Sequence, residues 1–371
     1  MKVVSGRQWR VMAFFDVEVV GDDNSTEWDR ALESCYLAPF SGLSWFGDVF
    51  AKHFDLSSHN ILARNPNGDI VCCLPGVTGY RYSPRTLGPP PLTYAGGFFF
   101  KEGVDIDDKR GIFEEMMFFL VERGFRRLRV TATSWSPECL GLKAKNEACK
   151  YYTSVLECKG EEALWSNLHR SLRKALRKAD RSKLSCRVFD LVEVLEDVFY
   201  PVYLLNMRKF GTPPQSQHFF KHLAKVADDR LKLFVAFKDD DIAAILLMYA
   251  GKYNVELLVS ASVPSMRGYR PIDLVLWEAI KWAVREGKNY VIFGPIKDSG
   301  QMQYKNTWHV QVLPVFDYTL HLSRQNEAYI QYRKFVSEIN PSIRVMSTIL
   351  RRISPQQLSK LGPFLRRLLQ R

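Results

Sequence analysis

The chain has 371 residues, which is enough for two or three domains of ordinary size. Apolar residues make up 46% and aromatic residues 13% of the chain, a composition that excludes a disordered or low-complexity protein. The 52 basic and 40 acidic residues give a net charge of +12. The expected partners are therefore anionic: nucleic acid, a phosphorylated metabolite or acidic lipid head groups.

Cysteine usage and apolar runs give an expectation for localisation. Seven cysteines without a Cys-x-x-Cys pair favour reduced, buried thiols and argue against a zinc ribbon or a thioredoxin site. The first residues lack the apolar stretch and cleavage site of a signal peptide. The longest apolar run, 242–250, has nine residues, less than half of the roughly 20 that span a bilayer. We expect a cytoplasmic protein that is either free or peripheral at the inner face of the membrane.

The first half of the chain alternates short strands with amphipathic helices. A turn, Asn65-Pro-Asn-Gly68, joins two of the strands, and a loop rich in Pro and Gly covers 87–97. Apolar periodicity predicts strands at 14–20, 60–64, 69–74 and 127–133, and helices at 28–35, 44–53 and 109–122.

The second half repeats this plan. Residues 161–187 are strongly basic and are predicted to be helical. Pro271 suits the first turn of a helix that Gly287 ends. Further helices are predicted at 196–207, 217–226 and 271–285, and strands at 231–237, 242–249, 255–261, 290–293 and 315–320.

The two halves share an order of helices, then strands, then a long helix and a strand. This is a coarse duplication at about 150 residues, and it predicts a mixed α/β fold. We place an N-terminal domain at 1–160, a C-terminal domain at 161–335 and a basic amphipathic helical tail at 336–371. After Glu338 the chain has seven basic residues and no acidic one.

A basic helix is the sharpest charged feature. Leu168, Leu172 and Leu176 recur every four residues, which gives an apolar stripe beside a basic one. The basic stripe consists of Arg170, Arg173, Lys174, Arg177, Lys178 and Arg181. Several guanidinium groups on one face can bind phosphate, so the functional interpretation is an anion clamp. The alternative is a solvated helix face.

Two other segments carry candidate residues. The turn Gly211-Thr-Pro-Pro214 ends a helix, and its plain interpretation is structural. Residues 293–308 are predicted to be a strand followed by a polar loop, where α/β sheets place ligands. On this loop Lys305 is either a solvated lysine or a cation near a developing oxyanion.

Several common sites are absent from the sequence. No G-x-G-x-x-G follows a predicted strand, and neither a P-loop nor a G-x-S-x-G elbow occurs. His218 and His222 lack an evident third ligand, so no metal site is predicted. Without a helix-turn-helix, RRM or OB signature, we do not expect DNA as a partner.

The order of these features resembles the FemAB-like (CelD-type) acyltransferases of the GNAT-fold superfamily, from its branch linked to peptidoglycan bridges or exopolysaccharide. In the first half the resemblance rests on Trp28, on FSGLSWFGDVFAKHF and on PPPLTYAGG. In the second half it rests on LWSNLHRSLRKALRKADRS, VYLLNMRKFGTPPQSQHFFKHL, PIDLVLWEAIKWAVREG and FGPIKDSGQMQYKNTWH, and at the end on the tail. It covers most of the chain.

The resemblance implies two tandem GNAT-like domains with the active site in or near the second. It implies transfer of an acyl group from acyl-CoA, or of an aminoacyl group from aminoacyl-tRNA, to an amine of a cell-envelope precursor or surface glycan. The acceptor would be a small molecule or a lipid-linked glycan, and no cofactor would be tightly bound. Both donors stay open, because Arg267-Gly268-Tyr-Arg-Pro271 keeps the arginine and glycine of the GNAT pyrophosphate loop but not its spacing.

The resemblance also implies roles for single residues. Lys305 matches the lysine that steadies the tetrahedral intermediate, and Tyr304 just before it is a second candidate for stabilising the oxyanion. Arg173 and Arg177 match an anion-binding pair, and Arg208 matches the arginine before the Gly-Thr-Pro turn. Arg267 and Gly268 are the candidates for a phosphate site at a helix N-terminus. Asp298 is the nearest acidic candidate for a base, although such transfer needs none when proximity suffices.

A second hypothesis belongs to another class of protein. It is a catalytically silent scaffold that sits on an anionic membrane surface through the basic tail and binds envelope-assembly proteins. The tail has a plainer alternative as well, which is packing on the second domain. Loss of Lys305 discriminates the two functions, because a scaffold tolerates it and an enzyme does not.

Overall fold

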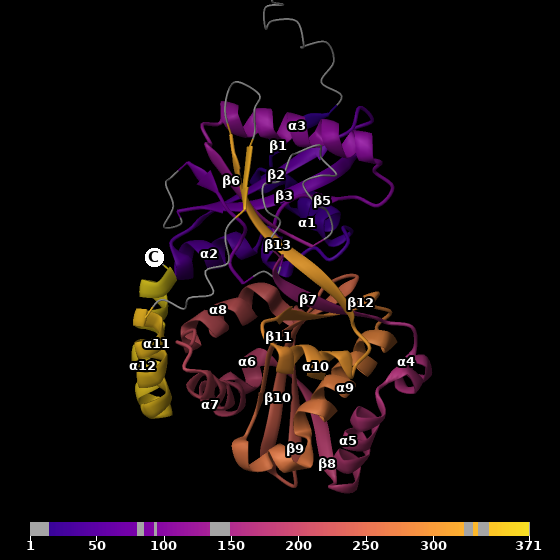
Figure 1. Cartoon of the computed structure of the whole chain (residues 1–371), viewed down its shortest axis with the longest axis vertical. Coiled ribbons are helices and arrows are strands. Elements are labelled where there is room, and N and C mark those ends of the chain that lie inside the picture. Colours follow the sequence, from indigo (N-terminus) through magenta and orange to yellow (C-terminus); the bar gives the residue numbers. More distant parts are fainter. Residues whose placement is uncertain are drawn as a thin grey trace, which may run out of the picture. The chain divides into compact units, whose positions relative to one another are not determined.

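The computed structural model of the chain describes residues 15–79, 85–92, 95–133, 149–322, 329–332 and 341–370 (Figure 1). These residues form two compact units, each assembled from separate stretches of the chain. Unit 1 lies within Met1–Ser44, Leu56–Ala148 and Phe316–Arg333. Unit 2 lies within Trp45–Asp55, Cys149–Val315 and Lys334–Arg371.

Unit 1 has an antiparallel sheet in the order β1-β2-β3-β5, and a second group in which β6 pairs with β4 and β13. Its helix α3 packs Ile112, Met116 and Leu120, four residues apart, into the unit's core. The helices are α1 (Ser25–Glu33) and α3 (Ile106–Glu122). The strands are β1 (Asp16–Val19), β2 (Ser57–Arg64), β3 (Ile70–Thr78), β4 (Thr86–Leu87), β5 (Phe99–Phe100), β6 (Arg127–Ala132), β14 (Tyr329–Tyr332) and the second half of β13 (Gln311–His321).

Unit 2 is built on a sheet in the order β7-β12-β11-β10-β9-β8, in which β11 and β12 run parallel. The strands are β7 (Cys149–Glu157), β8 (Leu184–Asp190), β9 (Leu231–Lys238), β10 (Asp241–Ala250), β11 (Asn254–Ser262) and β12 (Tyr290–Ile296). The helices are α2 (Phe46–Phe54), α4 (Glu161–Asn167), α5 (Arg170–Arg181), α6 (Leu191–Val194), α7 (Tyr200–Phe210), α8 (Gln217–Ala227), α9 (Pro271–Arg285), α10 (Ser299–Asn306), α11 (Pro341–Arg352) and α12 (Pro355–Gln370).

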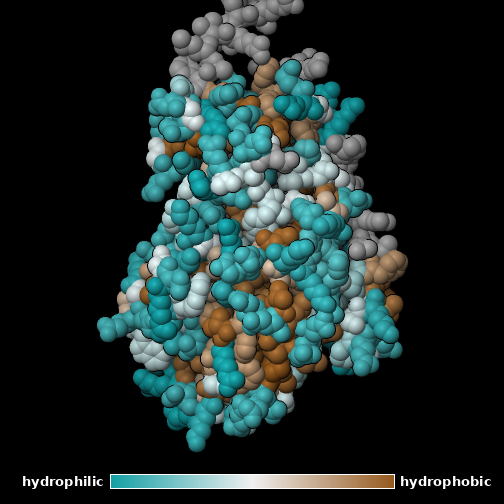
Figure 2. All heavy atoms as spheres, turned by 180° about the vertical axis from the view of Figure 1, so that it is seen from behind, coloured by the Kyte–Doolittle hydropathy of each residue, from teal (hydrophilic) through white to brown (hydrophobic). Residues whose placement is uncertain are grey.

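Helices cover both faces of this sheet. Helix α9 crosses β8 to β12, whereas α6 and α7 contact β8, β9 and β11 (Figure 1). Leu246 and Met248 of β10 pack with α9, and the intervening Leu247 is also buried, pointing to the other face. Hydrophilic residues form most of the surface in Figure 2, although hydrophobic residues also reach it.

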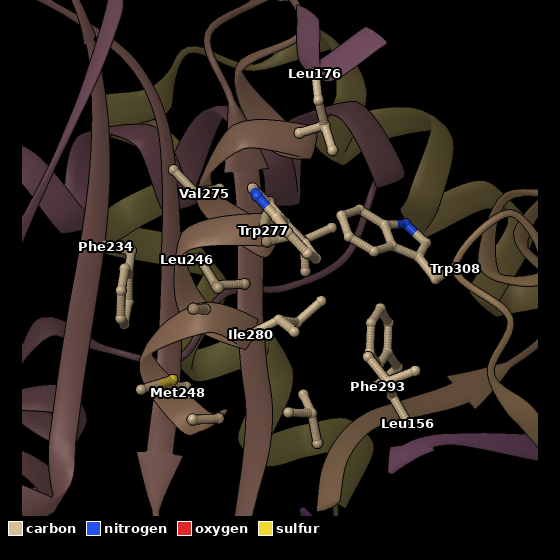
Figure 3. Packing of buried hydrophobic residues seen from close by; sticks show 14 of the residues in the cluster. Leu156, Leu176, Phe234, Leu246, Met248, Val275, Trp277, Ile280, Phe293 and Trp308 are labelled. Carbon is tan, nitrogen blue, oxygen red and sulfur yellow. The ribbon is translucent and has the colours of Figure 1, made fainter. Parts of the chain in front are cut away.

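The core under α9 contains large aromatic side chains. Figure 3 shows Trp277 of α9 and Trp308, just after α10, pointing toward one another above Phe293 of β12. The ring centroids of Phe293 and Trp308 are 6.0 Å apart, and Trp308 is 1% exposed. This packing anchors the end of α10 against β12 and thereby places the residues just before Trp308.

The boundaries of the units differ from the predicted division at 160 and 335. The stretch Trp45–Asp55 joins unit 2, because α2 packs on α8. His222 Nε2 of α8 lies 2.9 Å from Asp48 Oδ2, and His222 Nδ1 lies 3.0 Å from His53 Nε2. The first boundary falls near 148, since β7 is a strand of unit 2, and the tail is part of unit 2.

Two predicted elements need correction. The basic segment 161–187 is not helical throughout: α5 ends at Arg181, Lys183 has a φ of +55°, and Leu184 begins β8, which pairs with β9. The predicted polar loop after residue 293 contains a helix, α10. By contrast, α9 begins and ends at the predicted residues, 271 and 285. Among the described residues, no helix has the length and hydropathy needed to cross a membrane.

Candidate functional site

The site is centred on the place where β11 and β12 separate. Their parallel pairing covers Asn254–Glu256 and Tyr290–Ile292 and goes no further in the described register. Each strand has an irregularity there, because Leu258 is an extra residue against β10 and Phe293 is an extra residue against β7. Leu257 to Ser260 are partly exposed although β11 is an internal strand. The sheet is therefore open to solvent beside β11.

Lys305 occupies the β12 side of this separation. Its Nζ donates hydrogen bonds to the carbonyl oxygens of Phe293 (2.8 Å), Gly294 (2.8 Å) and Pro295 (3.0 Å). Strand β12 lacks β11 as a partner from residue 293 onward, so the ammonium supplies donors that a strand would otherwise supply. Burial, together with the charge of Lys297, lowers the pKa of Lys305 to about 8.

Tyr304 ties α10 to α9. Its hydroxyl donates to Asp273 Oδ1 at 2.9 Å, and Arg270 Nε lies 2.7 Å from Asp273 Oδ2. Asp273 is 3% exposed, and burial raises its pKa, whereas the Arg270 charge and the Tyr304 hydrogen bond lower it. Burial and the neighbouring Asp273 charge raise the pKa of Tyr304 well above its usual value of 10. The phenol is thus a hydrogen-bond donor at neutral pH.

Asp273 is a site residue that no sequence pattern indicates. It is in the first turn of α9, and Arg270 at the start of that helix has a φ of +68°. An acidic residue three positions after an arginine at a helix start is an ordinary surface pattern, which gives no sign of burial. Its second partner, Tyr304, lies 31 residues away in the sequence.

Asp298 caps α10. Its Oδ1 accepts a hydrogen bond from the backbone N–H of Gln301 at 2.8 Å, and Gln301 Oε1 accepts one from the N–H of Lys297 at 3.0 Å. The two bonds stabilise the first turn of α10, and an aspartate at the N-cap is a sequence signal for the start of a helix. Asp298 and Lys305 are therefore at opposite ends of α10, separated by roughly 10 Å along its axis.

Arg267 and Gly268 lie in a short 3-10 turn, Pro264–Tyr269, between β11 and α9. Both are exposed. A Cβ built on Gly268 meets no atom within 4 Å, so neither space nor backbone geometry requires glycine there. The turn follows the open part of β11, which runs parallel to β12, so the turn is at the same end of the sheet as the carbonyls that Lys305 binds.

The two arginines of α5 have different environments. Leu172 and Leu176 bury one side of α5, which packs on α9. Arg173 Nη1 donates to the carbonyl oxygen of Ser166 at 2.7 Å, so it links α5 to the end of α4. Arg177 is exposed one turn further on.

Arg208 is in the last turn of α7, and its Nε lies 3.4 Å from the carbonyl oxygen of Arg351 in α11. Gly211 ends α7 with a φ of +61°, and a Cβ there would collide with Ser347 of α11. The turn Gly211–Pro214 therefore packs against the tail helices, which agrees with its structural interpretation. Among the described residues, no group of three or more His, Cys, Asp or Glu could hold a metal ion.

Comparison with known proteins agrees with this architecture. Residues 166–306 match the family model described as an acetyltransferase (GNAT) domain, a stretch that contains Lys305, Asp273 and Arg177. No curated protein matches the chain significantly. The structure called FemX is 12% identical with a TM-score of 0.63, over 81% of this chain and 96% of FemX.

Two further solved structures are similar. A conserved protein of unknown function from Bacteroides thetaiotaomicron is 8% identical with a TM-score of 0.53, over 83% of this chain and 99% of that one. The C-terminal domain of a putative lysylphosphatidylglycerol synthetase from Agrobacterium fabrum is 12% identical with a TM-score of 0.51, over 82% of this chain and 94% of that one. The expected two-domain α/β fold of GNAT type is confirmed, and residues 166–306 are similar to a GNAT acetyltransferase domain.

Proposed function

We propose that the protein is an acyltransferase that moves an acyl or aminoacyl group from acyl-CoA or aminoacyl-tRNA to an amine. The observation that carries this proposal is the open separation of β11 and β12, with Lys305 on its edge. It lies within the stretch that matches the acetyltransferase domain model. The finer assignment is a FemAB-like enzyme acting on a cell-envelope precursor or surface glycan.

The proposed reaction is aminolysis of an ester or thioester. The acceptor nitrogen bonds to the donor carbonyl carbon, the C–O or C–S bond breaks, and the tRNA hydroxyl or the thiol leaves. The nitrogen loses a proton to solvent or to the leaving group, and bringing the two substrates together supplies much of the rate.

Lys305 has the chemistry to stabilise the developing oxyanion. For this role one of its N–H groups moves from a β12 carbonyl to the substrate oxygen, while the other two keep the ammonium in place. Removing one such donor typically costs about 10²–10³ in rate. Tyr304 acts as a positioning residue, because it fixes α10 through Asp273.

Exposed arginines are the candidates for holding the anionic part of the donor. Arg267 is exposed in the turn after β11, and Arg177 is exposed on α5, which packs on α9 and β8, whereas Arg173 and Arg208 are bonded to backbone carbonyls. One structure of similar fold is named a putative lysylphosphatidylglycerol synthetase, and that name is consistent with an aminoacyl donor.

The experiment begins with titration calorimetry of acetyl-CoA at low and moderate salt. Arg177→Ala and Arg267→Ala are expected to weaken binding, with exposed Lys225→Ala of α8 as the control. If the intact protein does not bind acetyl-CoA, transfer from charged tRNA to an amine is measured next. Binding that no arginine variant alters would contradict the proposed anion site.

A silent scaffold is the second candidate, and one observation favours it. All three donors of Lys305 are bound to β12 carbonyls, so the lysine already has a structural role. Acyl transfer by the intact protein distinguishes the enzyme from the scaffold. The variant Lys305→Arg keeps the positive charge and is measured beside it. Turnover with either donor excludes the scaffold, whereas folded protein without turnover on both donors supports it.

A further inference from the structure

The tail helices α11 and α12 use one side for packing on α7 within unit 2. Leu350 and Leu358 are 1% and 0% exposed. Arg366 Nη1 donates to the carbonyl oxygen of Pro213 at 2.7 Å, and Gly362 lies against Pro214. One side of the tail is therefore packed against the rest of unit 2, but this packing buries only part of the tail's apolar residues.

Among the tail side chains that the structure describes, four large apolar ones are exposed instead. Val345 and Ile349 of α11 are 61% and 55% exposed, and Leu361 and Phe364 of α12 are 53% and 63% exposed. Spacings of four and three residues put each pair on one side of its helix. We call these four side chains the outer face. Hydrophobic surface is visible along the edge of unit 2 where the tail lies (Figure 2).

Two exposed basic residues lie beside the outer face. Arg352 is three residues after Ile349, and Lys360 is four residues before Phe364, so each shares a side of its helix with an apolar residue. Both are exposed. From residue 339 to 371 the sequence contains seven basic residues and no acidic one, although the net charge of the whole chain is only +12. A partner that binds this face must therefore both accept apolar side chains and carry negative charge.

We propose that the outer face of α11 and α12 docks unit 2 on the surface of an anionic lipid bilayer. The four apolar side chains enter the head-group region, and Arg352 and Lys360 pair with lipid phosphates beside them. A helix with exposed aromatic and aliphatic side chains between basic ones has the amphipathic pattern of interfacial helices. This inference is independent of the proposed acyl transfer.

The tail is joined to the candidate site through α7. Gly211 and Pro214 at the end of α7 contact the tail, and Asn206 Nδ2 of α7 lies 3.3 Å from the carbonyl oxygen of Ser260 in the open part of β11. Docking would therefore hold the open end of β11 at a fixed distance from the bilayer. The docking itself does not require the acyl transfer proposed above; where that proposal holds, this arrangement suits a bilayer-associated acceptor.

The test is co-sedimentation of the full chain with vesicles of phosphatidylcholine, with and without phosphatidylglycerol. We expect binding to the anionic vesicles and at least tenfold weaker binding to the neutral ones. The double variant Ile349→Ser with Phe364→Ser should weaken binding about tenfold or more. Arg352→Gln with Lys360→Gln should weaken it several-fold and more so at high salt.

Matched controls separate docking from general stickiness. Val192→Ser removes an apolar side chain of α6 that is 66% exposed and outside the tail, and it should bind vesicles like the parent protein. Circular dichroism should show unchanged melting, since every substituted residue is exposed. Absence of binding, equal binding to neutral vesicles, or tail variants that bind like the parent would overturn the proposal. The proposal would also be overturned if sedimentation velocity showed a dimer that the Ile349→Ser/Phe364→Ser variant dissociates.

Discussion

Replacing Lys305 with methionine separates its structural role from its chemical one. The substitution removes donors from the carbonyls of Phe293 and Gly294, which are partly buried, and of Pro295, which water can reach. A hydrogen bond to a charged group contributes about 1.5–3 kcal/mol. Ser154 Oγ also lies 3.3 Å from the Gly294 carbonyl oxygen, so that acceptor keeps a partner. We expect the free energy of unfolding to fall by about 2–3 kcal/mol.

Guanidinium unfolding, followed by circular dichroism, measures this loss. For a unit of about 150–250 residues the loss corresponds to a melting temperature lower by roughly 5–10 °C. Lys225→Met, an exposed lysine of α8, is the matched control and should change stability by less than about 0.5 kcal/mol. If Lys305→Met is as stable as this control, the three carbonyl contacts do not support β12, and the structural argument for Lys305 is refuted.

The same pair of proteins gives a prediction for pH. Burial lowers the pKa of Lys305 to about 8, below its usual 10.5, so between these values the unfolded chain binds a proton that the folded chain has lost. Unfolding then takes up a proton, and stability rises with pH. From pH 7 to pH 9 the stability of the parent should rise relative to Lys305→Met by at most about 1.4 kcal/mol. A difference that stays constant over this interval would show that Lys305 keeps its proton in the folded chain.

Two further substitutions test the neighbouring contacts. Tyr304→Phe removes a donor from buried Asp273 and should lower the free energy of unfolding by about 1–2 kcal/mol at pH 7. Because loss of this hydrogen bond raises the pKa of Asp273 further, the loss of stability should be smaller at pH 4. Unfolding measured at both pH values checks this. Gly211→Ala meets both a positive φ and Ser347, so it should lower the melting temperature by several degrees, whereas Gly268→Ala, with open space around it, should change the melting temperature little.

The sequence predicts elements best where one pattern decides the structure. Helix α9 was found residue for residue, because Pro271 fixes its first turn and its apolar residues follow helical spacing to Arg285. The strands β9 to β11 were found because short apolar runs are separated by turn residues. Unit boundaries were predicted less well, since α2 belongs to unit 2 through contacts with α8, which is far along the chain.

Helix α10 was predicted as a loop because its composition is polar. With no buried residue, it has no apolar stripe for a periodicity search to find. The sequence carries a different signal, the N-cap residue Asp298, whose carboxylate accepts a hydrogen bond from the N–H of Gln301. A cap of this kind predicts where a helix begins even when packing against neighbours, such as that of Trp308, supplies most of its stability.

The sequence selects basic residues but does not show which donors the fold already uses. Lys305 is predicted to stabilise the oxyanion and Arg173 to bind an anion, and both donate to backbone carbonyls. Asp273 was missed because its partner Tyr304 is on another helix. An anionic substrate gains most from donors that need not leave a protein acceptor, since each broken hydrogen bond subtracts from the affinity. Exposed Arg177 and Arg267 should therefore contribute more to substrate affinity than Arg173, and comparison of the three alanine variants in one binding assay tests this order.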